Sequence, residues 1–175
     1  MEWIDFLLKA LVVGYGSIGK RHVKNLLKIP SMKILVCTKK THEKNKRIEF
    51  VYSIKDAINE KPDFVIIANV TSSHVDTAIE FAKNGIDLFI EKPLSNTLSH
   101  CKDLEKIVKK KKLVTMMGCN FRFDKSIIMI KKILENEELG KIISVHAENG
   151  SYLPNWHLYE DYRKGYSARK ELGGG

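Results

Sequence analysis

The sequence has few of the residues that build extracellular, fibrous or membrane-spanning proteins. Its 175 residues include three cysteines and no CxxC pair, which argues against a disulfide framework or a structural zinc site. Four prolines and 11 glycines are too few for a collagenous or low-complexity chain. No apolar run approaches the ~18 residues of a membrane span, and Glu2 and Asp5 stand where a signal peptide would be positive. We therefore expect a packed cytoplasmic protein.

The chain is basic, with 30 lysines and arginines against 21 aspartates and glutamates and a formal net charge of +9. This balance favours anionic partners such as phosphates, nucleotides or nucleic acid without choosing among them. The sharpest basic run, Lys109 to Lys112, falls at the end of a predicted helix, where cations complement the helix dipole. Because no aromatic residue is interleaved to stack on bases, nucleic acid is the weakest hypothesis. The six histidines show no HxxxH or HExxH spacing, so no metal site is predicted.

Short apolar runs alternate with helically periodic segments through the first two thirds of the chain. The runs predicted to be strands are 10–13, 33–37, 64–68, 87–90 and 113–117, with a further short strand near 50–51. The predicted helices are 18–27, 54–60, 75–82, which Thr71, Ser72 or Ser73 can cap, and 97–110. This alternation predicts an α/β fold, a Rossmann-type doubly wound parallel sheet with its ligand at the carboxyl ends of the strands.

The character changes beyond Asn120. A helix is expected over 127–134, and the alternation of Ile143, Val145 and Ala147 predicts a strand over 141–148. A polar segment rich in aromatic residues follows. The tail therefore begins a different structural unit.

The segment Gly14-Tyr15-Gly16-Ser17-Ile18-Gly19 matches GxGxxG, directly after a predicted strand and at the start of a predicted helix. Gly14 permits the tight turn, Gly16 lets the backbone approach a pyrophosphate, and Gly19 lets helix and strand pack closely. The helix start at Ser17 and Ile18 supplies N–H donors and positive partial charge. The alternative is a glycine-rich turn without a ligand.

The end of the second strand discriminates between NAD and NADP, because a carboxylate there binds the ribose 2′-hydroxyl. This chain has Cys37-Thr38-Lys39-Lys40 at that point, with no carboxylate. A hydroxyl followed by two ammonium groups suits a 2′-phosphate. We therefore predict NADP in preference to NAD, with a solvated lysine loop as the alternative interpretation.

Glu91-Lys92-Pro93 closes the predicted strand 87–90 at the edge where a nicotinamide would lie. A lysine there can bind a substrate hydroxyl and exchange its proton as hydride is transferred. A charged surface turn is the alternative. His74, at the start of the predicted helix that follows the strand 64–68, either touches the ligand or is a partly buried capping residue.

With GYGSIG, HVDTAIEFAKNGIDLFIEKP and CNFRF in that order, the sequence resembles the Gfo/Idh/MocA family of NAD(P)-dependent oxidoreductases over nearly its whole length. The resemblance implies that Lys92 is the active-site lysine, and that Asn69, His74, Glu91 and Asn120 join the cofactor site. The proline that the family usually has after the residue matching Asn69 is missing here. The family resemblance also implies a dinucleotide-binding domain over 1–120 and the incomplete start of an α+β substrate and oligomerisation domain over 121–175.

In the family, Asp and His spaced as DxxxH follow the glycines that correspond to Gly173 to Gly175, and neither is present here. We therefore expect a truncated chain that binds a dinucleotide weakly or not at all and does not turn over. The resemblance implies hydride transfer to or from a sugar, cyclitol or nucleotide-sugar, the small-molecule partner of the parent protein. A non-catalytic dinucleotide-binding sensor or assembly module is the alternative. The substrate could contact an aromatic and basic stretch, namely Tyr152, Trp156, His157, Tyr159 and Arg163.

Overall fold

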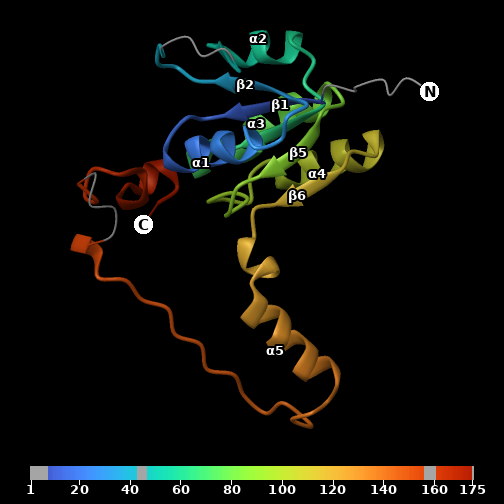
Figure 1. The fold of residues 1–175 in the computed structure, drawn as a ribbon, viewed down its shortest axis with the longest axis vertical. Coiled ribbons are helices and arrows are strands. Elements are labelled where there is room, and N and C mark those ends of the chain that lie inside the picture. The colour runs from blue at the N-terminus through green and yellow to red at the C-terminus, as the bar shows by residue number, and fades with distance from the viewer. Residues whose placement is uncertain (1–7, 43–46, 156–160, 175) are drawn as a thin grey trace.

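A six-stranded parallel sheet forms the centre of the protein (Figure 1). The structure is a computed structural model that describes residues 8–42, 47–155 and 161–174. The strand order β3-β2-β1-β4-β5-β6 confirms the doubly wound topology, because the strand order reverses between the neighbouring strands β1 and β4. The strands are β1 (Leu8–Val13), β2 (Met32–Cys37), β3 (Ile48–Val51), β4 (Phe64–Ile67), β5 (Asp87–Ile90) and β6 (Thr115–Met117).

Two hydrophobic clusters, one on each face, hold the sheet between helices. Along β1, Leu11 and Val13 belong to one cluster and Ala10 and Val12 to the other, as expected when successive side chains point to opposite faces. This explains the unbroken apolar runs of the central strands, since neither face meets water. The first cluster includes side chains of α2, α3 and α4, and the second includes those of α1. The helices are α1 (Ser17–Leu26), α2 (Ile54–Asn59), α3 (His74–Lys83), α4 (Cys101–Lys111) and α5 (Lys125–Glu135).

The start of α3 differs from the expected capping. A short 3-10 turn, η1 (Thr71–Ser73), precedes the helix, and no side chain of this turn caps it. Thr71 is instead buried, with 2% of its surface exposed. The helix ends at Lys83, and Gly85 follows it in the left-handed region at φ +78°, which is common just after a helix.

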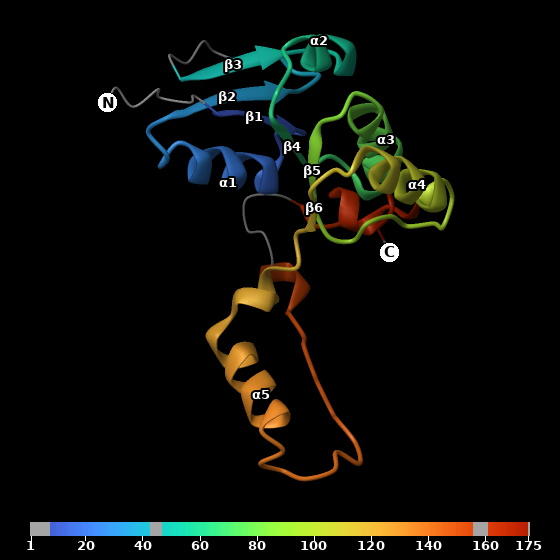
Figure 2. The same cartoon turned by 90° about the vertical axis from the view of Figure 1, so that its right-hand side faces the viewer.

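The strand predicted over 141–148 is wrong. These residues are described, and they form neither a strand nor a helix. Ile143 and Val145 are 94% and 82% exposed, so the alternating apolar side chains have no surface to pack against. A strand needs a neighbour for its N–H and C=O groups, and no strand of the described residues pairs with this segment. Helix α5 projects away from the sheet, and the segment 141–148 continues from its end as an extended chain (Figures 1 and 2).

The last described residues return to the sheet. After the short 3-10 turns η2 (Asn120–Phe123) and η3 (Leu153–Asn155), the tail segment, residues 161–174, carries η4 (Tyr166–Ala168) and η5 (Lys170–Leu172). Figure 2 shows this segment beside the sheet rather than beside α5. Gly173 lies against η1, because a Cβ built on it would come within 2.8 Å of the Thr71 Cβ. Among the described residues, no helix has the length and apolar character needed to cross a membrane.

Candidate functional site

A pocket of about 880 Å³ opens at the carboxyl ends of the central strands. Strand register explains why distant residues meet there: Val13 at the end of β1 pairs with Cys37 and Ile67, and Ile67 pairs with Ile90. The residues that follow these four therefore reach the same edge. The lining comprises Val13, Gly14, Gly16, Ser17, Ile18, Cys37, Thr38, Lys39, Tyr52, Ser53, Ile54, Ala68, Asn69, Val70, Ser73, His74, Thr77, Glu91, Lys92, Tyr162, Gly165, Tyr166 and Ser167.

The glycine turn is shaped by two different constraints. Gly14 has φ +94°, and a Cβ there would lie 2.6 Å from the Ala68 carbonyl oxygen, while a Cβ on Gly19 would collide with the Gly14 carbonyl. Both glycines are therefore required by the fold itself. A Cβ on Gly16 would meet no protein atom within 4 Å, and Gly16 lines the pocket. No side chain therefore covers the backbone at Gly16, so a pyrophosphate can approach it at the start of α1.

Thr38 and Lys39, which follow β2, also line the pocket, as do Tyr52, Ser53 and Ile54. Lys40 is not among the lining residues, and its backbone N–H lies 3.3 Å from the Thr38 hydroxyl. Burial raises the pKa of the neighbouring Cys37 thiol, with a smaller contribution from the charge of Asp56. Tyr52 was not predicted as a site residue, because it belongs to none of the motifs found in the sequence.

Asn69 offers an unpaired acceptor beside the glycine turn. Its Nδ2 donates to the Thr77 hydroxyl at 2.9 Å, whereas its Oδ1 is buried without a hydrogen-bond partner. A buried carbonyl oxygen without a partner is costly, and a donor on a bound ligand would satisfy it. Together with the open surface at Gly16, this orphaned oxygen makes the pocket fit a dinucleotide.

His74 also lines the pocket, but both of its ring nitrogens are engaged by the protein. Nδ1 lies 2.8 Å from the Pro93 carbonyl oxygen, and Nε2 lies 3.1 Å from the Asn69 carbonyl oxygen. With 2% of its surface exposed, His74 is a buried link between two loops of the site. Of the two interpretations of His74, the geometry favours the structural one.

Glu91 and Lys92 lie at the end of β5 and both line the pocket. The Glu91 carboxylate is 2.6 Å from His22 Nε2 on α1, and its side chain is 17% exposed. Burial would raise the pKa of Glu91, but the hydrogen bond and charge of His22, with the Lys92 N–H and His74, bring it below the usual 4.5. Glu91 is therefore an ionised group already paired with the protein, whereas the Lys92 side chain is exposed toward solvent.

Three of the predicted site residues lie outside the lining. Gly19 packs against the Gly14 carbonyl, Lys40 follows the last lining residue after β2, and Asn120 is exposed in η2. Gly14, Gly16, Ser17, Ile18, Thr38, Lys39, Asn69, His74, Glu91 and Lys92 are brought together.

The tail segment supplies a wall of the pocket through Tyr162, Gly165, Tyr166 and Ser167. The sequence drew attention to aromatic residues in this region, but to different ones. Tyr152 is 71% exposed and outside the lining, and Arg163 pairs with Asp161 at 2.9 Å. Residues 156–160, and with them Trp156, His157 and Tyr159, lie outside the described residues. No group of three or more potential metal ligands occurs in the part of the chain that the structure describes.

Comparison with known proteins decides the family. A family described as "Oxidoreductase family, NAD-binding Rossmann fold" (Gfo/Idh/MocA) matches residues 8–119. The chain belongs to this family. The chain is similar to an uncharacterized oxidoreductase of Bacillus subtilis, YrbE, with 32% identity over 74% of this chain and 40% of that protein. The scyllo-inositol 2-dehydrogenase (NAD(+)) of the same organism is 30% identical over 80% of this chain and 44% of its own.

A solved structure gives the same assignment. The myo-inositol 2-dehydrogenase of Lactobacillus plantarum superposes with a TM-score of 0.71 and 31% identity, covering 78% of this chain and 43% of that one. The chain thus spans less than half the length of the curated relatives that it matches. The resemblance inferred from the three sequence motifs is confirmed, and so is the Rossmann-type fold.

Proposed function

We propose that this chain is the coenzyme-binding part of a dehydrogenase that oxidises or reduces a carbinol or ketone carbon of a sugar, cyclitol or nucleotide-sugar. One observation carries the proposal: Gly16 with its open backbone surface at the start of α1, Asn69 with its unpaired side-chain oxygen, and Lys92 all line one pocket of about 880 Å³. The inositol dehydrogenases among its relatives support the substrate class. Cytoplasmic location and a small-molecule partner complete the proposal.

The coenzyme supplies hydride chemistry, and the side chains of this chain bind and orient it. The N–H groups at Ser17 and Ile18 would hold the pyrophosphate over Gly16. Asn69 Oδ1 would accept a hydrogen bond from the ligand. Glu91 and His74 are bonded to protein groups, so Lys92 is the group placed to hold or move the proton of a substrate hydroxyl.

We further propose the division into a dinucleotide-binding domain over 1–120 and the start of a substrate domain over 121–175. Residue 120 lies just after β6, the last strand of the parallel sheet among the described residues, and α5 projects away from that sheet. Dinucleotide binding is accordingly the activity to test in residues 1–175, and turnover belongs to the whole protein.

NADP is the preferred coenzyme in this proposal. Thr38 and Lys39 both line the pocket, and the segment from Cys37 to Lys40 contains no aspartate or glutamate. An ammonium at this position favours a ribose 2′-phosphate over a 2′-hydroxyl. We expect Lys39→Ala to weaken NADPH binding by about tenfold, or ~1.4 kcal/mol, while NADH binding stays within about twofold. Lys40→Ala, whose residue does not line the pocket, is the matched control.

The deciding experiment titrates the purified chain with NADPH and NADH and follows nicotinamide fluorescence and thermal unfolding together, since a ligand of the folded state raises its stability. We expect saturable binding with a rise in the unfolding temperature. Lys92→Ala should bind the dinucleotide nearly as well as the wild type, because the lysine is assigned to the substrate. Absence of binding to either dinucleotide would contradict the proposal. Binding without oxidation or reduction of any sugar or cyclitol by the whole protein would favour the non-catalytic module.

A further inference from the structure

The residues on either side of Lys92 are each held by a histidine from a different helix. Glu91 is bound by His22 of α1 at 2.6 Å, and the Pro93 carbonyl oxygen lies 2.8 Å from Nδ1 of His74 at the start of α3. The peptide that bears Lys92 is thus fixed on both sides. Of the two histidines, His22 lies outside the pocket lining, so its position must be explained by something other than contact with the ligand.

Strand geometry brings His22 to this point. Phe89 and Glu91 are two residues apart at the end of β5, so their side chains point to the same face of the sheet, the face that α1 covers. The His22 ring packs edge-on against the Phe89 ring, with centroids 5.4 Å apart and planes at 69°. This contact directs Nε2 toward the Glu91 carboxylate. Both side chains of the pair are largely buried, at 19% and 17% exposure.

The Glu91 carboxylate is confined on its other sides as well. The Lys92 N–H lies 3.3 Å from Glu91 Oε2, and a Cβ on Gly118 would lie 3.0 Å from that same oxygen. The backbone beside it is also paired, because the Glu91 N–H bonds the Ile67 carbonyl of β4 at 3.0 Å. One carboxylate therefore joins α1, the end of β5 and the residue after β6.

We infer that His22 is a positioning residue for Lys92: through Glu91 it fixes the lysine-bearing loop to the helix whose start would bind the coenzyme phosphates. The inference rests on the proposed function for the role of Lys92, but the link itself is independent of any ligand. Binding of a dinucleotide at the start of α1 would then restrain residues 91–93, and a site without the link would bind the coenzyme without ordering the lysine.

The test compares two substitutions of similar size. His22→Leu keeps the bulk against Phe89 and removes the bond, whereas His22→Gln retains an N–H donor toward Glu91. Hydrogen exchange of the peptide segment 89–95, measured by mass spectrometry without ligand, should rise about tenfold in His22→Leu and stay within about twofold of wild type in His22→Gln. Equal exchange in His22→Leu and wild type, or equal acceleration in both variants, would overturn the inference.

A second readout separates coupling from simple structural support. In the wild type and His22→Gln, NADPH should further slow exchange in segment 89–95, and in His22→Leu this slowing should be lost although NADPH still binds within about threefold of wild type. Slowing that persists in His22→Leu would contradict the coupling. If the wild type binds no dinucleotide, the proposed function fails, while the ligand-free comparison still decides the link. Gly118→Ala, whose new Cβ would press on the Glu91 carboxylate, should reproduce the ligand-free effect of His22→Leu.

Discussion

At the scale of single residues, the three motif glycines have separable roles. Gly19→Ala forces a Cβ onto the Gly14 carbonyl, whereas Gly16→Ala places one in open space above the turn. We expect Gly19→Ala to destabilise the fold by several kcal/mol, on the order of an overpacked core. The free energy of unfolding of Gly16→Ala should lie within about 0.5 kcal/mol of the wild-type value. This variant should nevertheless bind NADPH at least about tenfold more weakly, because its methyl group occupies the space that the pyrophosphate would take.

Thermal unfolding and fluorescence titration of both variants check these expectations. A Gly16→Ala variant that binds NADPH as tightly as the wild type would show that the pyrophosphate does not bind at this surface. One that is strongly destabilised would show that the turn is constrained at all three glycines.

The ionised Glu91 makes a stability contribution that depends on pH. Its pKa is below 4.5 in the folded chain, so the folded state binds this proton less readily than the unfolded one. The resulting stability is fully present above about pH 4.5 and is lost as the pH falls through the lowered pKa. We expect Glu91→Gln to cost about 1.5–3 kcal/mol at pH 7, typical of a buried hydrogen bond to a charged group, and less near pH 3.5.

Urea unfolding across pH 3.5 to 7 measures this difference. Glu105→Gln is the control, because that carboxylate is exposed and lies on α4 away from the pocket. A Glu91→Gln deficit that stays constant across this range would exclude ionisation of Glu91 as its source.

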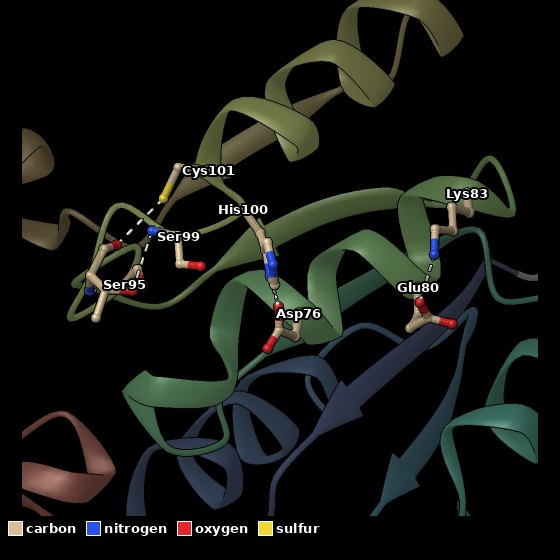
Figure 3. Close-up of polar contacts among 8 residues, drawn as sticks. Asp76, Glu80, Lys83, Ser95, Ser99, His100 and Cys101 are labelled. Atoms are coloured by element: carbon tan, nitrogen blue, oxygen red, sulfur yellow. Dashed lines mark hydrogen bonds and ion pairs between the residues drawn. The ribbon is translucent and has the colours of Figure 1, made fainter.

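At the scale of elements, the buried face of α3 should contribute far more to the stability of the fold than its exposed, charged face. Figure 3 shows His100 reaching Asp76, and Lys83 pairing with Glu80, on the outside of this helix. The Asp76 pair is 2.7 Å long, but its side chains are 68% and 57% exposed. We expect Asp76→Asn to change the unfolding free energy by less than about 1 kcal/mol, because exposed ion pairs contribute little.

Phe81, on the inner face of the same helix, is fully buried in the cluster shared with β1 and β5. Phe81→Ala should cost about 3–5 kcal/mol through lost burial and the cavity left behind. Chemical unfolding of the two variants side by side checks both values. Comparable losses would mean that the polar surface of α3 contributes more than its exposure allows.

Local sequence patterns were sufficient for the elements that bury their side chains within the sheet. The apolar runs predicted every strand from β1 to β6, and the signal is clearest in β1, β2 and β4, whose residues are mostly buried. The alternation of Ile143 and Val145 failed as a predictor, since a strand also needs a partner that local sequence does not specify. For the same reason, Tyr162 and Tyr166 escaped notice: their place in the pocket depends on a chain reversal after α5.

At the scale of the whole molecule, the tail segment is held to the sheet at Gly173. This residue has φ +86°, and a Cβ on it would lie 2.8 Å from the Thr71 Cβ. Gly173→Val should therefore detach the tail, at a local cost of about 1–3 kcal/mol for the backbone conformation alone. The sheet should remain intact, while the pocket loses the wall formed by Tyr162 and Tyr166.

Limited proteolysis should cut Gly173→Val after Arg163 or Lys164 much faster than the wild type, and the affinity for NADPH should fall. Gly150→Ala is the matched control, because a Cβ there meets nothing within 4 Å. A Gly173→Val variant as resistant to proteolysis as the wild type would show that the tail is held by other contacts.

The residues that form this wall are far along the chain from the other lining residues, and this affects when the site is completed during synthesis. Every other lining residue lies between Val13 and Lys92, and the next one along the chain is Tyr162. A ribosome adding 5–20 residues per second needs at least several seconds more to deliver the tail. During that interval the sheet can fold with its pocket open along one side, so a dinucleotide would meet the pocket of the nascent chain without the wall that the tail segment later supplies.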